Sequence, residues 1–277
     1  MIREPVRQLP WLRAIPAVAV ALPALIGPLV ASRDTEAASG LPFAEPDSSA
    51  WLGTDRLGRD VLTQLLHGGW GLIALAGVIA ILVAGPSSVL GTLAALRPRA
   101  GVFVERGADL AVLLPPMLGV LLVMLSWPES GVFGVITVAV LFGIPYCTRV
   151  FAAAAAGVAA TGYVEAARVS GESTAHIVFR EMLPNMRELC WTQLGLRFVT
   201  GMYIASAAAF LQLPGTLDAA NWAIMVRENA SGMLLNPWAA LAPSLAIAVV
   251  AVGVNISATA FGRIAPPGAD GPKGPRT

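Results

Sequence analysis

Charged residues are scarce in this chain. Asp, Glu, Lys and Arg make up 13% of its 277 residues, whereas soluble domains carry about 25%. Hydrophobic residues reach 56%, and the mean hydropathy is +0.71. This composition excludes an ordinary soluble domain and predicts a polytopic membrane protein. The net charge of +1 gives no indication of nucleic-acid binding.

Residues that usually carry metal or redox chemistry are also few. The two histidines, His67 and His176, are far apart in sequence, so we predict no metal centre built by this chain alone. The two cysteines, Cys147 and Cys190, lie in apolar runs, where cysteine usually serves as a small packing residue. We therefore expect neither a metal site nor a disulfide.

The chain contains a single lysine, Lys273, and no Gly-Lys-Ser/Thr sequence. A P-loop needs that lysine within a glycine-rich loop to hold ATP phosphates, so this chain cannot bind ATP in that way. The apolar runs also hold no nucleophile–base cluster of the kind that a membrane-embedded hydrolase requires. We predict that the chain is not an enzyme and carries no cofactor of its own.

Several apolar runs reach the roughly 20 residues that a membrane-spanning helix needs. Lipid offers the backbone no hydrogen bonds, so spanning segments are helices or closed barrels, and the unbroken runs exclude the alternating barrel pattern. The sequence therefore predicts an all-α fold with six transmembrane helices. The first run is longer than the apolar part of a signal peptide, although cleavage there stays an alternative. The predicted spans are 13–31, 70–96, 108–126, 131–156, 188–213 and 238–261.

Basic residues gather in alternate connections between these runs, and such an excess marks the cytosolic side. With the N-terminus inside, cytosolic segments hold thirteen of the 18 basic residues, outer segments hold Arg33, Arg56, Arg59 and Arg227, and Arg197 lies within a span. Both termini are therefore predicted to be cytosolic. The predicted organisation is an N-terminal stub and first helix at 1–31, an extracytoplasmic segment at 32–67, a five-helix core at 68–262 with a cytosolic loop at 157–187, and a disordered Pro/Gly-rich tail at 263–277.

The 157–187 loop is polar and helix-forming, although it lies between two apolar runs. Thr161 can cap a first helix, Gly171 interrupts it, Ser173 can cap a second helix, and Pro184 is expected to end that helix. The pattern predicts two short helices at an angle. They form either a surface for a partner protein or an amphipathic hairpin lying on the membrane.

Other polar residues have simpler local interpretations. Thr54 and Asp55 suit a helix cap, while Arg59 and Asp60 read as solvated charges, in an outer segment that turns helical near 56–67. Asp109 is expected to pair with Arg106 at i,i+3, just after a short basic loop at 97–107.

Arg197 is the only charge deep in a predicted span, which makes it a functional candidate. It either faces a solute pathway and meets a substrate carboxylate, or reaches the interface or a partner subunit. Gln193 and Asn255 are expected to form hydrogen bonds between helices.

Two motifs together carry a family resemblance. Glu165-Ala166-Ala167, three residues, Gly171 and then Leu183-Pro184-Asn185 resemble the EAA loop of bacterial ABC importer permeases. Trp51-Leu52-Gly53-Thr54-Asp55, two residues and Gly58-Arg59-Asp60 resemble the outer segment of the C-type permease in the oligopeptide/dipeptide/nickel group. The spacing of Arg106, Asp109 and Pro115 is a weaker third match, and the resemblance covers roughly residues 50–262.

The resemblance implies the architecture of a type I ABC importer permease in the bacterial cytoplasmic (inner) membrane. Its expected partners are a second homologous permease chain, two ATPase subunits that bind ATP and Mg²⁺, and an extracytoplasmic solute-binding protein. It places ATPase coupling on Glu165, Ala166, Ala167, Arg168, Gly171, Glu172, His176, Arg180, Leu183 and Pro184, and an extracytoplasmic motif on Gly53, Thr54, Asp55, Gly58, Arg59 and Asp60.

The chain departs from this group's pattern near the ends of spans five and six. An acidic residue and a Leu-Ser-Phe-Leu-Gly-Leu-Gly run are replaced by Ala205-Ser206-Ala207-Ala208-Ala209-Phe210-Leu211. The expected function is uptake of peptides or peptide-like solutes. Nickel or a metal–chelator complex is an alternative substrate, and a structural or sensory subunit that does not transport is an alternative of another class.

Overall fold

The structure is a computed structural model that describes residues 37–113, 115–211 and 221–262. Within those ranges the only extended pairings are two isolated bridges, Ala38 with Arg59 and Thr54 with Asp60. Helices form the remaining regular structure, as the all-α prediction requires. The predicted span at 13–31 and the predicted tail at 263–277 lie outside the described residues.

The helices occupy most of the described chain. In order they are α2 (Val61–Gly68), α3 (Trp70–Leu96), α4 (Pro98–Leu113), α5 (Pro116–Ser126), η2 (Pro128–Ser130), α6 (Gly131–Ala159), α7 (Gly162–Val169), α8 (Thr174–His176), η3 (Ile177–Met182), α9 (Leu183–Asn185), α10 (Arg187–Phe210), α11 (Trp222–Asn229), η4 (Ala230–Gly232) and α12 (Trp238–Gly262).

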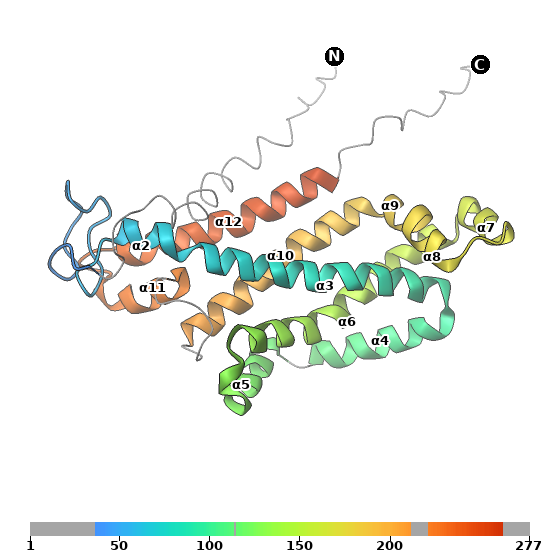
Figure 1. The fold of residues 1–277 in the computed structure, drawn as a ribbon, viewed down its shortest axis with the longest axis horizontal. Coiled ribbons are helices and arrows are strands. Elements are labelled where there is room, and N and C mark those ends of the chain that lie inside the picture. The colour runs from blue at the N-terminus through green and yellow to red at the C-terminus, as the bar shows by residue number, and fades with distance from the viewer. Residues whose placement is uncertain (1–36, 114, 212–220, 263–277) are drawn as a thin grey trace, which may run out of the picture.

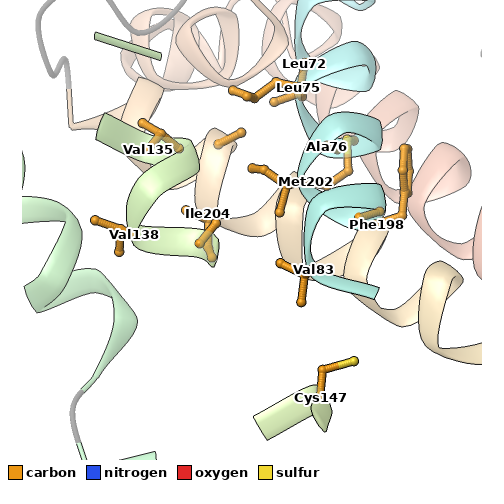
Figure 2. Packing of buried hydrophobic residues seen from close by; sticks show 14 of the residues in the cluster. Leu72, Leu75, Ala76, Val83, Val135, Val138, Cys147, Phe198, Met202 and Ile204 are labelled. Carbon is orange, nitrogen blue, oxygen red and sulfur yellow. The ribbon is translucent and has the colours of Figure 1, made fainter. Parts of the chain in front are cut away.

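The long helices α3, α4, α6, α10 and α12 run along the long axis of the molecule, with α7 and α8 at one end and α2 and α11 at the other (Figure 1). Helix α3 packs against both α6 and α10, and α10 also packs against α12. Buried side chains from these helices interdigitate, among them Val83, Val138 and Met202 (Figure 2). Since lipid is as apolar as these side chains, close packing rather than water exclusion holds such helices together.

Three helical segments are long and apolar enough to cross a membrane. They are Val61–Leu96, Pro128–Ala159 and Trp238–Gly262, and they contain the predicted spans at 70–96, 131–156 and 238–261. Helices α4 and α5 form a fourth candidate if the pair is counted as one broken span.

The apolar run at 108–126, predicted as one span, is not a single continuous helix in the structure. Residues Gly101–Ala111 and Pro116–Ser126 are bent by 78° relative to each other. Pro115 precedes the first residue of α5, and Pro116 is that residue. Neither proline has a backbone N–H, so a helix cannot continue through them but can begin there. The basic 97–107 stretch, predicted as a loop, lies mostly within α4.

Helix α10 matches the predicted span at 188–213 in position but is not among the candidate spans. Its sequence is less apolar because it carries Arg187, Glu188, Gln193 and Arg197. It packs against α3, α6 and α12, and the side that faces these helices carries the buried Gln193.

Candidate functional site

The 157–187 loop folds at the end of the bundle where α7 and α8 lie (Figure 1). Helix α7 ends in a Schellman turn, in which the N–H of Glu172 donates to the Ala167 carbonyl (3.1 Å) and the N–H of Gly171 donates to the Arg168 carbonyl (3.1 Å). Gly171 has φ +79°, a conformation that costs other residues free energy because they carry a Cβ. The predicted interruption at Gly171 is confirmed.

The caps of the two short helices differ. The Ser173 hydroxyl accepts a hydrogen bond from the N–H of His176 (3.2 Å), as predicted for a cap. Thr161 precedes α7 but makes no side-chain cap. Its hydroxyl instead donates to the Val158 carbonyl (2.6 Å).

Pro184 does not end the second helix, contrary to the prediction. Residues Ile177–Met182 form a π-helical turn, and the N–H of Leu183 donates to the Val178 carbonyl five residues earlier. Pro184 then lies in the first turn of α9, where the N–H that it lacks has no helical partner to lose. The loop therefore runs into α10 with little interruption.

One face of the loop is anchored in the bundle. Val164, Ile177, Val178, Met182 and Met186 are buried. The opposite face is open, since Glu165, Ala166, Arg168, Gly171, Glu172, Arg180 and Pro184 are exposed, while Ala167, His176 and Leu183 are half-buried. The resulting surface carries both signs of charge on a fixed backbone.

His176 lies between two carboxylates of this surface. Its Nδ1 is 3.8 Å from Glu172 Oε2, and its Nε2 is 3.9 Å from Glu181 Oε1. Both distances exceed hydrogen-bond length, so these are loose, exposed contacts that a partner protein can replace.

The 53–60 motif at the other end of the bundle folds into a compact, mostly buried loop held by internal hydrogen bonds, which we call the knot. The prediction of a helix cap at Thr54 and Asp55 followed by solvated charges is therefore wrong. The Asp55 carboxylate accepts hydrogen bonds from Leu57 N (2.8 Å), Arg59 N (2.8 Å) and Gln64 Nε2 (2.9 Å). Arg59 Nε lies 3.2 Å from Asp55 Oδ2 without forming a hydrogen bond. Asp60, and not Asp55, caps α2 by accepting from Leu62 N and Thr63 N.

The backbone of this loop turns so tightly at positions 53 and 58 that only glycine fits there. Both have positive φ, +70° and +76°. A Cβ on Gly53 would collide with the Ala44 carbonyl oxygen, and one on Gly58 would collide with the Gly40 carbonyl oxygen. The Thr54 hydroxyl accepts from Ala44 N (2.8 Å) and donates to the Leu41 carbonyl (2.5 Å).

The knot is bound to the C-terminal part of the chain by residues that we did not single out from the sequence. Asn236 is fully buried, and its Nδ2 donates to the Leu52 and Thr54 carbonyls, both at 3.0 Å. The Asn229 side chain accepts from Arg56 N (3.0 Å), and Arg56 Nε pairs with Glu228 Oε2 (3.1 Å). The only feature of the sequence that could have pointed to this region was the turn-forming Asn236-Pro237 pair.

Arg197 lies between α10 and α6. Its guanidinium carbon is 5.6 Å from the ring centroid of Tyr146, a cation–π distance. Its Nε is buried and has no hydrogen-bond partner among the described residues. Gln193 receives a hydrogen bond from Cys147 (3.7 Å), as predicted for a link between helices, whereas Asn255 Oδ1 is buried without a partner in the described part of the chain.

Asp109 does not pair with Arg106. Its carboxylate binds Arg149 Nη1 of α6 at 2.8 Å, so the contact joins two helices rather than two turns of α4. Within residues 37–113, 115–211 and 221–262 there is also no group of three His, Cys, Asp or Glu side chains that could hold a metal ion.

Comparison with known proteins gives one consistent family. Residues 87–269, about two thirds of the chain, match the family described as binding-protein-dependent transport system inner membrane component. A putative peptide permease of Brucella abortus is 29% identical over 213 residues, which are 76% of this chain and 70% of that protein.

Two further relatives have similar coverage. A probable D,D-dipeptide transport system permease of Escherichia coli K12 is 28% identical over 246 residues, 88% of this chain and 82% of that protein. A putative peptide transport system permease of Brucella suis is 27% identical over 239 residues, 86% of this chain and 80% of that protein. The chain therefore belongs to the inner membrane components of binding-protein-dependent ABC transport systems, as a non-catalytic permease subunit.

Proposed function

We propose that this chain forms half of the translocation pathway of a bacterial ABC importer for peptides or peptide-like solutes. The relatives named as peptide permeases support the solute class. A second homologous permease chain supplies the other half, and an extracytoplasmic binding protein delivers the solute. Two ATPase subunits bind ATP and Mg²⁺, since this chain has no Gly-Lys-Ser/Thr sequence.

The proposal includes six spans with both termini in the cytosol. Support comes from the three candidate spans and the bent α4–α5 pair, from α10 with 24 residues, and from the apolar run at 13–31. Exposed tryptophans support the positions of the two membrane surfaces, because Trp70, Trp127 and Trp238 lie at helix ends away from the 157–187 loop and Trp191 lies near it. Tryptophan is enriched at membrane–water interfaces, and basic residues favour the cytosolic side.

The 157–187 loop is the proposed coupling surface for the ATPase subunits. One observation carries this assignment: a charged, exposed face is held on the bundle by buried side chains and a Schellman turn at Gly171. A rigid surface transmits force, whereas a hairpin lying on lipid does not need fixed geometry. ATP-driven closure of the ATPases pushes on this surface and rocks the bundle between inward- and outward-open states. Nucleotide shifts that equilibrium only through different affinities for the two states.

Arg197 is the proposed pathway residue, at which a solute carboxylate forms an ion pair. Its buried Nε, which has no partner among the described residues, supports the role, since a buried donor without an acceptor favours an anionic ligand. The Tyr146 ring holds the guanidinium in place in the absence of solute.

Two proline substitutions in the coupling surface provide a matched test. Gly171→Pro cannot fit, because proline requires φ near −65° and Gly171 has φ +79°. Gly162→Pro fits, because Gly162 is the first residue of α7 and proline is favoured there. Thr161 already has φ −82° and ψ 147°, an extended conformation suited to a following proline.

The tagged chain is purified from its native membrane in mild detergent, and its partners are identified by mass spectrometry. We expect ATPases and a second permease with wild type and with Gly162→Pro, and loss of the ATPases alone with Gly171→Pro. Recovery of the ATPases with Gly171→Pro would refute the coupling assignment. Stimulation of ATPase activity by the loaded binding protein then separates a transporter from a structural or sensory subunit.

A further inference from the structure

A cavity of about 760 Å³ lies between the coupling surface and the helices that support it. Its walls come from α3, α4, α6, α8 and η3 and are mainly apolar, with Leu90, Leu93, Phe103, Ile144 and Phe179 among them. The volume falls within the range of small-molecule sites, about 300–1,000 Å³. No step of the proposed transport cycle uses this cavity.

One charged side chain, Arg97, lines the cavity. Arg97 directly follows the last residue of α3, and its backbone N–H donates to the Ala94 carbonyl. Its side chain is exposed and has no hydrogen bond or ion pair with any described residue. The cavity therefore presents an apolar interior beside one cation that has no partner among the described residues.

The open side of the cavity continues into an exposed apolar surface. Leu90, Phe103 and Phe179 line it and are also exposed, by 46%, 77% and 57%. Arg97 follows the last residue of the apolar helix α3, which is where a spanning helix meets the lipid headgroups. In the proposed orientation this is the cytosolic leaflet, whose anionic lipids attract arginine.

We propose that this cavity binds an anionic phospholipid of the cytosolic leaflet. An acyl chain lies among Leu90, Leu93 and Phe103, and the phosphate pairs with Arg97. The apolar lining suits the acyl chain of the lipid, and the Arg97 guanidinium suits its phosphate.

The lipid would contact both the proposed coupling surface and the helices that support it. Thr174, Ala175, Val178 and Phe179 belong to the coupling surface, whereas the opposite walls belong to α3 and α4. A bound lipid touches both and favours the arrangement in which the walls are close, in proportion to its affinity for that arrangement. Binding of an anionic lipid rests only on the membrane orientation given with the proposed function, whereas this regulatory consequence rests also on the coupling assignment.

Two substitutions test the two halves of the site. Arg97→Gln removes the charge, and Arg106→Gln is its control, since Arg106 is exposed on α4 and does not line the cavity. Gly107→Leu fills the cavity, because Gly107 lines it and a Cβ there meets no atom within 4 Å. Gly77→Leu is the matched control, a helical glycine with equally open space outside the cavity. Both glycines lie inside helices, where leucine has the higher helix propensity.

Native mass spectrometry of the intact complex counts bound lipid after addition of phosphatidylglycerol or phosphatidylcholine. We expect wild type and both controls to retain phosphatidylglycerol in preference to phosphatidylcholine. Arg97→Gln should lower phosphatidylglycerol affinity about fivefold, and Gly107→Leu should abolish the retained lipid. All variants should still carry the ATPases, so a failure of the lipid site is distinguishable from a failure of the coupling assignment.

Retention of phosphatidylglycerol by Arg97→Gln and Gly107→Leu at the wild-type level would overturn the proposal. Equal loss in Gly77→Leu would do so too, because the effect would then not depend on the cavity. Competition by soluble glycerol 3-phosphate would assign the arginine to a soluble phosphate ester instead of a lipid.

Discussion

Replacement of Asp55 by alanine tests the importance of the knot formed by residues 53–60. The Asp55 side chain is 2% exposed, so its carboxylate depends on partners within the protein rather than on water. Its partners are the backbone N–H groups of Leu57 and Arg59, the side-chain amide of Gln64, and the Arg59 guanidinium. Asp55→Ala removes all four interactions.

The expected loss follows from the contacts. Three hydrogen bonds at about 1 kcal/mol each give roughly 3 kcal/mol. The Arg59 side chain, 16% exposed, also loses its counter-ion, and breaking a buried ion pair typically costs about 3–5 kcal/mol. These contributions overlap, so we expect a destabilisation of about 3–5 kcal/mol. At roughly 2–4 °C per kcal/mol, Tm should fall on the order of 10 °C.

The predicted extracytoplasmic segment at 32–67 also offers a matched control. Asp47 also accepts hydrogen bonds from nearby groups, Ser49 N, Ser49 Oγ and Ala50 N, all at 2.7 Å. These bonds, chiefly that of the Ser49 hydroxyl, lower the pKa of Asp47. Because Asp47 is exposed, water replaces these bonds when the side chain is lost, and Asp47→Ala should change Tm much less.

The assay is thermal unfolding of the purified complex in detergent, followed by the loss of monodisperse protein on gel filtration. We expect Asp55→Ala to be the least stable variant, with Asp55→Asn also clearly below wild type, since an amide nitrogen would face one of the existing donors. Equal Tm values for Asp55→Ala and Asp47→Ala would refute the conclusion that burial makes this knot structural.

Three smaller changes have defined outcomes. Gly171→Ala should weaken binding of ATPase subunits about 5–30-fold, because a left-handed backbone costs about 1–2 kcal/mol once a Cβ is present and that Cβ meets no other atom. Gly162→Ala should leave titrated binding unchanged, and equal effects would contradict the role of the turn. Arg197→Gln should reduce vesicle uptake of a peptide with a free carboxylate roughly tenfold or more but spare an amidated peptide, whereas equal loss for both would indicate a structural role. Arg56→Ala should change the thermal stability by less than about 1 kcal/mol, because Arg56 is 42% exposed in its pair with Glu228; a loss as large as that of Asp55→Ala would show that this pair is not a simple surface contact.

Local features were predictable because their causes lie within a few residues. The apolar runs at 70–96, 131–156 and 238–261 correspond to helices of the expected length. Gly171 interrupts its helix, and Ser173 caps the next one. Short-range hydrogen bonds, backbone conformation and the length of an apolar run decide all of these, so they can be read from neighbouring residues.

Local reasoning failed where a polar side chain had two possible partners. Asp109 had Arg106 within its own helix, but it binds Arg149, 40 residues away. Asp55 and Asp60 both preceded a helical segment, and only Asp60 caps it. In each case the choice depends on which partner the fold brings into reach.

By itself the sequence determined the membrane class, the helical fold, the absence of a P-loop and the motifs that resemble the permease family. These follow from composition and from residues close together along the chain. Only the tertiary structure decided that Asn236 holds the knot across 184 positions of sequence, that Arg197 lies against Tyr146, and that a cavity with Arg97 adjoins the 157–187 loop. Helix packing selects such contacts among many distant pairs, and no local pattern along the chain specifies which pairs will meet.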